Sequence, residues 1–196
     1  MNDLRERVAR LARSLEGLTA DPEDAAGYAR FLDLIAPGER RSDAETMARQ
    51  STCGLVVAGI WRAVLATVPA PLRPPYQSGA ALRNIVATAG IAGALRDGRH
   101  RPQVGDVVHL QGVAGAVEHV YTAVEVGDDC AVVSIDGGQR DDRGLQTIAS
   151  RTRVVHLGKD RLTDGAERPI IHVIDLDALG ARFGIKPSED DAGDGG

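Results

Sequence analysis

Three residues in this chain have the types and the order needed for nucleophilic attack on a carbonyl carbon. Cys53 follows a short polar run and opens an apolar segment that reaches Leu65. The first turn of a helix lowers the pKa of a thiol, and its N–H groups can bind an oxyanion. His119 and Asp136 follow on two later segments with strand-like sequence. The order predicts a thiolate nucleophile, a histidine base and a carboxylate that orients the histidine.

Strand pairing gives an independent reason to place His119 beside Asp136. If Gly127-Asp128 forms a two-residue hairpin turn, counting outwards puts His119 directly opposite Asp136. Such side chains lie roughly 5 Å apart at Cβ, so the carboxylate can accept the Nδ1 proton of the imidazole. A three-residue turn would instead put Asp136 opposite Val120, on the wrong face. Gln139 lies outside this pairing and is the alternative partner for the histidine.

Three further polar residues are candidates for binding the oxyanion or the substrate: Gln50, Thr52 and Gln139. Gln50 lies about one helical turn before Cys53, where an amide side chain can supply a second oxyanion donor. Ser51 or Thr52 is expected to cap the helix that Cys53 opens, because a hydroxyl oxygen accepts the N–H groups of a first turn.

Other residues of reactive type fit structural roles. Cys130 lies inside a strand-like segment, where we expect it to pack as a small hydrophobe. His109, His156 and His172 lie in strand patterns without a partner at metal-ligand spacing, so no metal is expected. The sequence contains no glycine-rich phosphate loop, and no cofactor is expected. Asp136 precedes two glycines, so its alternative role is that of a turn residue.

The composition narrows the class of protein and its partners. The chain has 196 residues, of which 43% are hydrophobic and 26% charged, as is typical of a soluble globular domain. Only 3% are aromatic and the net charge is −5, which argues against nucleic-acid binding. Two cysteines in apolar surroundings argue against a disulfide framework.

The N-terminal segment does not have the apolar core of a Sec signal, and no apolar run reaches the length of a membrane span. We therefore expect no membrane insertion and synthesis in the cytoplasm. A substrate outside the cytoplasm would require export by a route that is independent of a signal peptide.

Helical periodicity in the first part of the chain gives way to strand periodicity in the second. Helices are expected at about 4–17, 21–35, 43–50, 53–65 and 78–95, with a proline-rich loop at 69–75. Strands are expected at 106–111, 117–126, 130–136, 145–150, 153–157 and 170–175. The predicted fold class is α+β: N-terminal helices packed on a C-terminal antiparallel sheet of about five or six strands.

Two motifs resemble those of a known family. Thr52-Cys53-Gly54-Leu55-Val56 looks like the Asp-Cys-Ser-Gly-Leu-Val of NlpC-type peptidases with one residue missing. Val104-Gly105-Asp106-Val107-Val108 looks like their Pro-Gly-Asp-Leu-Val. With His119 on the next strand, residues 50–136 resemble the papain-like peptidoglycan hydrolases, namely the CHAP amidases and NlpC-type peptidases. Thr52 stands where many NlpC-type enzymes have Asp, and Gln50 stands further upstream than the glutamine of CHAP domains.

This resemblance implies a papain-like fold and a cysteine peptidase or amidase. Residues 1–40 would be a helical extension, 41–185 the hydrolase domain and 186–196 a disordered acidic tail. The implied reaction cleaves a stem-peptide bond of peptidoglycan through a thioester, with Cys53 as nucleophile, His119 as base and Asp136 as orienting residue. Together with the absent signal, this suggests an exported antibacterial effector, for which an immunity protein is a candidate partner, or a lysin that reaches the wall by lysis.

Two alternatives remain open. The same chemistry suits a cytosolic cysteine protease or acyl transferase that acts on proteins. A catalytically inert binding module would keep the fold and use its N-terminal helices to dock a partner, and in that case replacing Cys53 would change nothing.

Overall fold

The computed structural model describes residues 3–50, 52–67, 92–112, 118–129, 131–157, 162–164 and 168–186. Four α-helices come first: α1 (Asp3–Ser14), α2 (Ala25–Ile35), α3 (Arg41–Ala48) and α4 (Cys53–Val64). A short 3-10 helix, η1 (Ala92–Ala94), leads into the strands, and α6 (Leu176–Phe183) follows them. The strands are β1 (Leu95–Asp97), β2 (Val107–Leu110), β3 (His119–Val126), β4 (Ala131–Arg140), β5 (Gln146–Leu157), β6 (Leu162–Asp164) and β7 (Arg168–Ile174).

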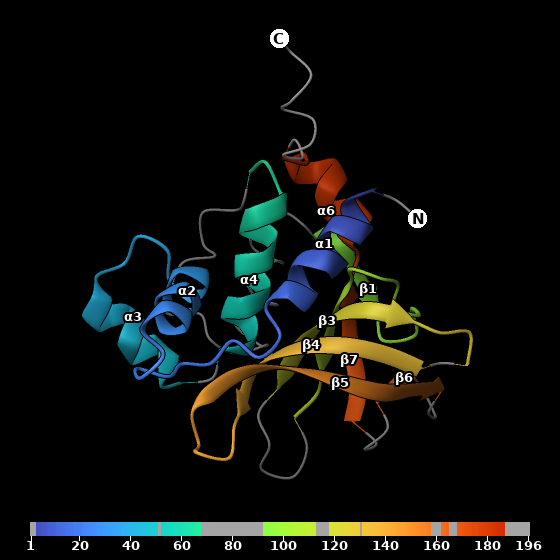
Figure 1. The fold of residues 1–196 in the computed structure, drawn as a ribbon. Coiled ribbons are helices and arrows are strands. Elements are labelled where there is room, and N and C mark those ends of the chain that lie inside the picture. Colours follow the sequence, from blue (N-terminus) through green and yellow to red (C-terminus); the bar gives the residue numbers. More distant parts are fainter. Residues whose placement is uncertain are drawn as a thin grey trace.

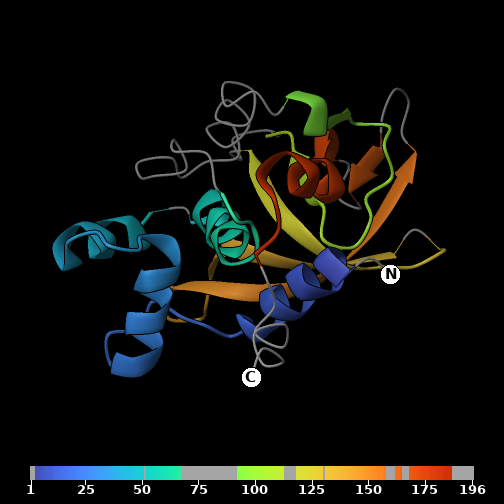
Figure 2. The ribbon, with the colours of Figure 1, turned by 90° about the horizontal axis from the view of Figure 1, so that it is seen from above.

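Six of these strands form a closed antiparallel barrel in the order β7-β2-β3-β4-β5-β6. The barrel closes because β7 pairs with β2 through Ile170–Ile174 and with β6 through Arg168 and Pro169. β1 continues along the β6 edge of β7, where Leu95 lies opposite Ile174. Figure 1 shows the helices gathered on one side of this barrel, and Figure 2 shows α1 and α4 lying across its strands.

The predicted papain-like arrangement of helices on an open sheet is therefore wrong. The α+β composition and the antiparallel pairing are present, but the sheet has no free edge at β6 because this strand joins β7. The closing strand spans only Leu162–Asp164, too short for an alternating pattern to predict it. Closure depends on pairing between segments distant in the chain, which local periodicity does not encode.

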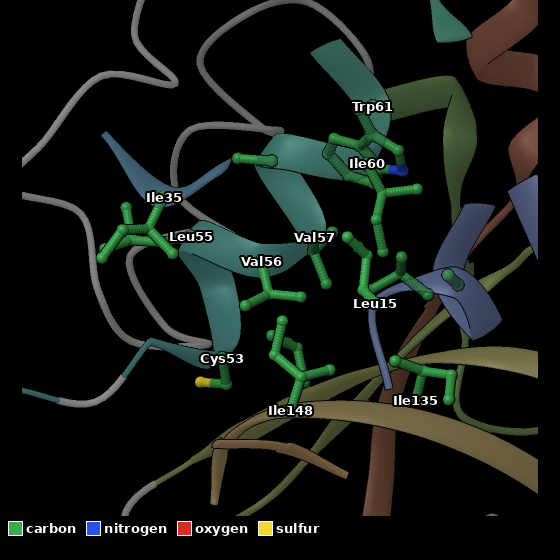
Figure 3. Close-up of a cluster of buried hydrophobic side chains, with 14 of the residues drawn as sticks. Leu15, Ile35, Cys53, Leu55, Val56, Val57, Ile60, Trp61, Ile135 and Ile148 are labelled. Atoms are coloured by element: carbon green, nitrogen blue, oxygen red, sulfur yellow. The ribbon is translucent and has the colours of Figure 1, made fainter. Parts of the chain in front are cut away.

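Two apolar cores lie on opposite faces of the barrel wall. One fills the barrel and includes Leu110, Tyr121 and Val173, each almost fully buried. The other lies between the helices and the outer face of the strands. In this second core α4 is the central element, and Figure 3 shows its side chains gathered with Leu15, just after α1, Ile135 of β4 and Ile148 of β5. The predicted buried helix at 53–65 is confirmed.

Other sequence predictions have mixed outcomes. The strands expected at 145–150 and 153–157 are one continuous strand, β5. Helix α6 was not predicted; Asp175 caps it by accepting N–H groups of Asp177 and Ala178. The proline-rich loop at 69–75, most of the helix at 78–95, Cys130 and the tail beyond Lys186 lie outside the described residues.

The Gly-Asp motif has a structural role. The buried Asp106 carboxylate accepts hydrogen bonds from Arg5 Nη1 at 2.8 Å, the Gln103 N–H at 2.9 Å and the Leu176 N–H at 3.1 Å. These contacts join the first helix, the start of β2 and the start of α6.

Among the helices that the structure describes, none has both the length and the apolar composition needed to cross a membrane.

Candidate functional site

Cys53 is the first residue of α4, as the sequence predicted, and it is 1% exposed. Figure 3 shows it at the end of α4, beside Ile148 of β5, with its sulfur atom pointing away from that side chain. An N-terminal position of this kind places the thiol at the positive end of the helix dipole. The helix that carries Cys53 is buried along almost its whole length, so the position of the thiol is fixed by packing.

His119 connects Cys53 to Asp136. The imidazole is hydrogen-bonded to the Cys53 thiol, and its Nε2 lies 2.6 Å from Asp136 Oδ1. The sequence analysis expected the carboxylate to take the Nδ1 proton, whereas the structure places it at Nε2. Nδ1 is therefore the nitrogen left for the thiol. The structure brings the three predicted catalytic side chains together in the predicted order.

The strand register that produces this contact differs from the predicted one. Val126 pairs with Val132, three residues beyond the predicted partner, which alone would turn Asp136 to the other face. A bulge at Val124 shifts the register back by one residue, so Thr122 pairs with Ile135. The remaining shift of two residues preserves the face. Asp136 lies diagonally across from His119, within reach of the imidazole.

Arg153 of β5 lies behind Asp136 and was missed by the sequence analysis. Its guanidinium donates to Asp136 Oδ1 at 2.5 Å, to Ser134 Oγ at 2.9 Å and to Asp164 Oδ2. It also lies over the Tyr121 ring, 4.3 Å from the ring centre. Arg153 and the buried Val155 are two residues apart on β5, so their side chains lie on the same face of the strand. A charged residue at this spacing from a hydrophobic one was the signal available in the sequence.

The buried charges determine the protonation states of His119 and Asp136. Burial alone would lower the pKa of His119, but the hydrogen bonds with Asp136 and Cys53 and the charges of both raise the His119 pKa above its ordinary value. Burial would raise the pKa of Asp136, but the hydrogen bond from His119 and the charge of Arg153 hold it below its ordinary value. The site therefore favours an ionised carboxylate beside a protonated imidazole.

Ion pairing supports the same preference. Arg153 pairs with both Asp136 and Asp164, and a protonated His119 gives the buried Asp136 a second cation. The positive charge of Arg168 also acts on Asp164, Cys53 and Asp136. Buried charges are stable only when they are paired and hydrogen-bonded, so the imidazolium favours the ionised Asp136.

Thr52 holds the start of α4 against the barrel. It occupies the N-cap position, yet its side chain does not cap the helix. Its hydroxyl accepts the Gly138 N–H at 3.0 Å and donates to Gln146 Oε1 at 3.4 Å. The expected capping role is thus replaced by a link between α4 and the two strands β4 and β5. The first-turn N–H groups of α4 are not taken up by this hydroxyl.

Gln50 and Gln139 do not join the three catalytic candidates. Gln50 is exposed just after α3, and Gln139 accepts a hydrogen bond from Arg151 Nη2 at 2.5 Å. No described contact links either glutamine to Cys53 or His119. Asp136, which is fully buried, is therefore the residue in position to orient the histidine.

Elsewhere in the barrel wall, His109 and His172 lie side by side. Their rings stack with centroids 6.2 Å apart, and His109 Nε2 lies 2.8 Å from Glu118 Oε2. Over the described residues, no group of three or more His, Cys, Asp or Glu side chains is arranged to hold a metal ion.

Comparisons with known proteins add no relative. Neither a protein-family model, nor a curated protein, nor a solved structure matches this chain.

Proposed function

We propose that this protein is a cysteine-dependent amide hydrolase with Cys53 as nucleophile, His119 as base and acid, and Asp136 as orienting residue. One observation carries the proposal: the imidazole of His119 contacts the Cys53 thiol and the Asp136 carboxylate at the same time. A nucleophile, a base within hydrogen-bond reach and a third group that orients the base are the requirements for nucleophilic catalysis.

In the first half-reaction, the Cys53 thiolate attacks the amide carbonyl carbon and forms a tetrahedral oxyanion. The protonated His119 then gives its proton to the leaving nitrogen, the C–N bond breaks, and the amine departs. The acyl group remains on Cys53 as a thioester. Since the pKa of His119 is raised by its two partners, the imidazole holds the proton that this step consumes.

In the second half-reaction, neutral His119 removes a proton from water, which attacks the thioester. The C–S bond breaks, the carboxylic acid product leaves, and Cys53 returns as thiolate beside protonated His119. Asp136 keeps the ring orientation constant through both steps, because its contact at Nε2 leaves Nδ1 directed to the reacting atoms.

The N-terminus of α4 is the candidate for stabilising the oxyanion. The Thr52 hydroxyl is engaged by Gly138 and Gln146 and leaves the first-turn N–H groups to other partners. The dipole of α4 adds a positive potential at the same place. Gln50 is exposed, and we do not propose it for this role.

The proposed substrate is a stem-peptide bond of peptidoglycan. This part rests on the resemblance of the Cys53 and Gly105-Asp106 motifs to wall hydrolases. Mass spectrometry of products released from purified sacculi, for the wild type beside Cys53→Ala, tests it. New muropeptides from the wild type alone support the proposal, and their masses name the bond. Identical product profiles contradict the wall substrate.

A second measurement tests the chemistry without a substrate. Alkylation of Cys53 by iodoacetamide, followed by peptide mapping across pH, should show reaction at a lower pH in the wild type than in His119→Asn. The Asp136→Asn variant should fall between them, because it keeps the imidazole and loses its orienting charge. If the profiles of all three proteins superimpose, His119 does not activate Cys53, and this result would contradict the proposed cysteine catalysis.

A further inference from the structure

We propose that the cavity between α2, α3 and the β4–β5 hairpin binds a carboxylate of the substrate, next to the nucleophile. This cavity has a volume of about 390 Å³ and is separate from the His119–Asp136 network. As a substrate site it rests on the proposed hydrolase function, but its ligand chemistry can be tested without catalysis. Figures 1 and 2 both show the hairpin reaching the end of the barrel where α2 and α3 lie.

The lining combines apolar walls with two cations. Tyr28, Ala48 and Leu145 contribute apolar surface, and Arg49 and Arg140 contribute the charge. Among the described residues of the lining, none is acidic. A pocket of this composition suits a ligand with a short apolar part and a negatively charged group, because arginine binds carboxylates through two parallel N–H donors.

Both arginines are free of ion pairs with any residue that the structure describes. Among the described residues, the Arg140 guanidinium donates to the Gly144 carbonyl oxygen, at 2.5 Å, which holds it at the cavity wall. Most other arginines close to this face are paired. Arg41 binds Glu45 at 2.8 Å, for example. Two unpaired cations at one cavity, among paired neighbours, indicate a place where an external anion completes the charge balance.

The nearby carboxylates do not compensate these charges. Asp21, Glu23 and Asp141 all lie within 4 Å of Arg143, at 2.6, 3.9 and 3.5 Å. These carboxylates and Glu45 contact arginines other than Arg49 and Arg140, so among the described residues the charges in the lining itself are those of Arg49 and Arg140. An anionic ligand would meet two cations and no carboxylate in this described lining.

The cavity is connected to the start of α4. Gln146 lines it and is only 4% exposed, and its Oε1 accepts the hydroxyl of Thr52, the residue directly before Cys53. Because Gln146 contacts Thr52 and Thr52 directly precedes Cys53, a ligand held against Gln146 lies close to the proposed nucleophile. A peptide chain can span this gap, with its carboxylate in the cavity and its scissile amide at Cys53.

The shared ligand chemistry has two sources in a peptide: a free C-terminal carboxylate or an acidic side chain. Three probes separate them. N-acetylglutamine carries only the terminal carboxylate, N-acetylglutamic acid α-amide carries only the side-chain carboxylate, and N-acetylglutamine amide carries neither. Binding of each to full-length Cys53→Ala is measured by calorimetry at low ionic strength, so that hydrolysis does not interfere.

We expect at least one carboxylate probe to bind roughly tenfold tighter than the neutral probe, as a charge-assisted hydrogen bond provides. The preference should disappear in the Arg49→Gln/Arg140→Gln double variant. It should persist in Arg182→Gln, which removes one positive charge from α6, away from the hairpin. The stronger of the two carboxylate probes identifies the source.

Three results would overturn the proposal: equal binding of acidic and neutral probes, no binding of either carboxylate probe at millimolar concentration, or a preference that survives in the double variant. None of these bears on Cys53 chemistry, which the alkylation profile tests separately. Once a substrate that the protein hydrolyses is known, the double variant should raise KM for the substrate that carries the carboxylate and leave kcat nearly unchanged.

Discussion

Gly137 of β4 lies so close to Val56 of α4 that a Cβ atom added at Gly137 would fall 2.5 Å from Val56 Cγ2 and 3.1 Å from the Thr52 carbonyl oxygen. Only glycine allows the helix to approach the strand to this distance. Asp136 is the neighbouring residue on β4, and Cys53 opens α4. The contact therefore sets the spacing between the nucleophile and the carboxylate behind its histidine.

Gly137→Ala should force α4 away from β4. Overpacking of this kind destabilises by roughly 1–3 kcal/mol, and the loss of activity should exceed what the fraction unfolded explains. Denaturant unfolding and Cys53 alkylation measure the two effects. Gly93→Ala is the matched control, because a Cβ there meets no atom within 4 Å. Equal behaviour of the two variants would contradict the role of Gly137.

Arg153→Met should be strongly destabilising, because it leaves the carboxylates of Asp136 and Asp164 buried without their cation. Breaking a buried pair from one side costs roughly 3–5 kcal/mol. Urea unfolding of Arg153→Met beside Arg153→Met/Asp164→Asn checks the cause. If charge imbalance is the reason, the double variant recovers part of the lost free energy. Further loss in the double variant would mean that Arg153 acts through packing alone.

Thr52→Val should destabilise the protein, and Thr52→Ser should not. Valine has nearly the shape of threonine but leaves the Gly138 N–H without the hydroxyl acceptor that binds it at 3.0 Å. An unsatisfied buried donor costs about 1–3 kcal/mol, and the half-buried Gly138 N–H should lie at the lower end of this range. The unfolding free energy and the alkylation rate of Cys53 should both fall for valine. Two variants with the same unfolding free energy would show that the hydroxyl does not hold the helix start.

His119 should make stability depend on pH. Burial lowers its pKa, but Asp136 and Cys53 raise the pKa above the unfolded value, so the folded state binds the proton more tightly. Its contribution is therefore fully present below the unfolded pKa, near 6.5, and is lost as pH rises through the folded pKa. The difference in unfolding free energy between wild type and His119→Gln should be larger at about pH 6 than at about pH 9.

Urea unfolding at constant ionic strength measures this difference. His100→Gln, outside the site in the bend after β1, is the control for removing a histidine. A difference between wild type and His119→Gln that stays constant over this pH range would contradict the proposed coupling to Asp136.

Local sequence was sufficient to predict the position of Cys53 and the two strands that carry His119 and Asp136. A polar run before an apolar helix and a period of two are short-range signals. The face of Asp136 was also predicted, but through a wrong register. The longer turn and the bulge at Val124 shift the pairing in opposite directions, and neither leaves a distinctive mark in the sequence.

The remaining features depend on contacts that no local pattern reveals. The closing of the sheet requires β6 to meet β7, and the role of Arg153 requires Asp164 of the neighbouring strand β6 to lie beside it on the same face. The burial of this ion pair is a consequence of the closed barrel. The open sheet expected from the resemblance offered no interior in which such a pair would be buried.

Cys53 belongs to the helical layer, whereas His119 and Asp136 belong to the barrel wall, with 65 residues between Cys53 and His119. The thiol therefore gains its partners only when the helices dock on the completed barrel. A nascent or partly unfolded chain would carry an ordinary cysteine in place of a reactive one. The reactivity that we propose for Cys53 should therefore develop only after the helices and the barrel have joined.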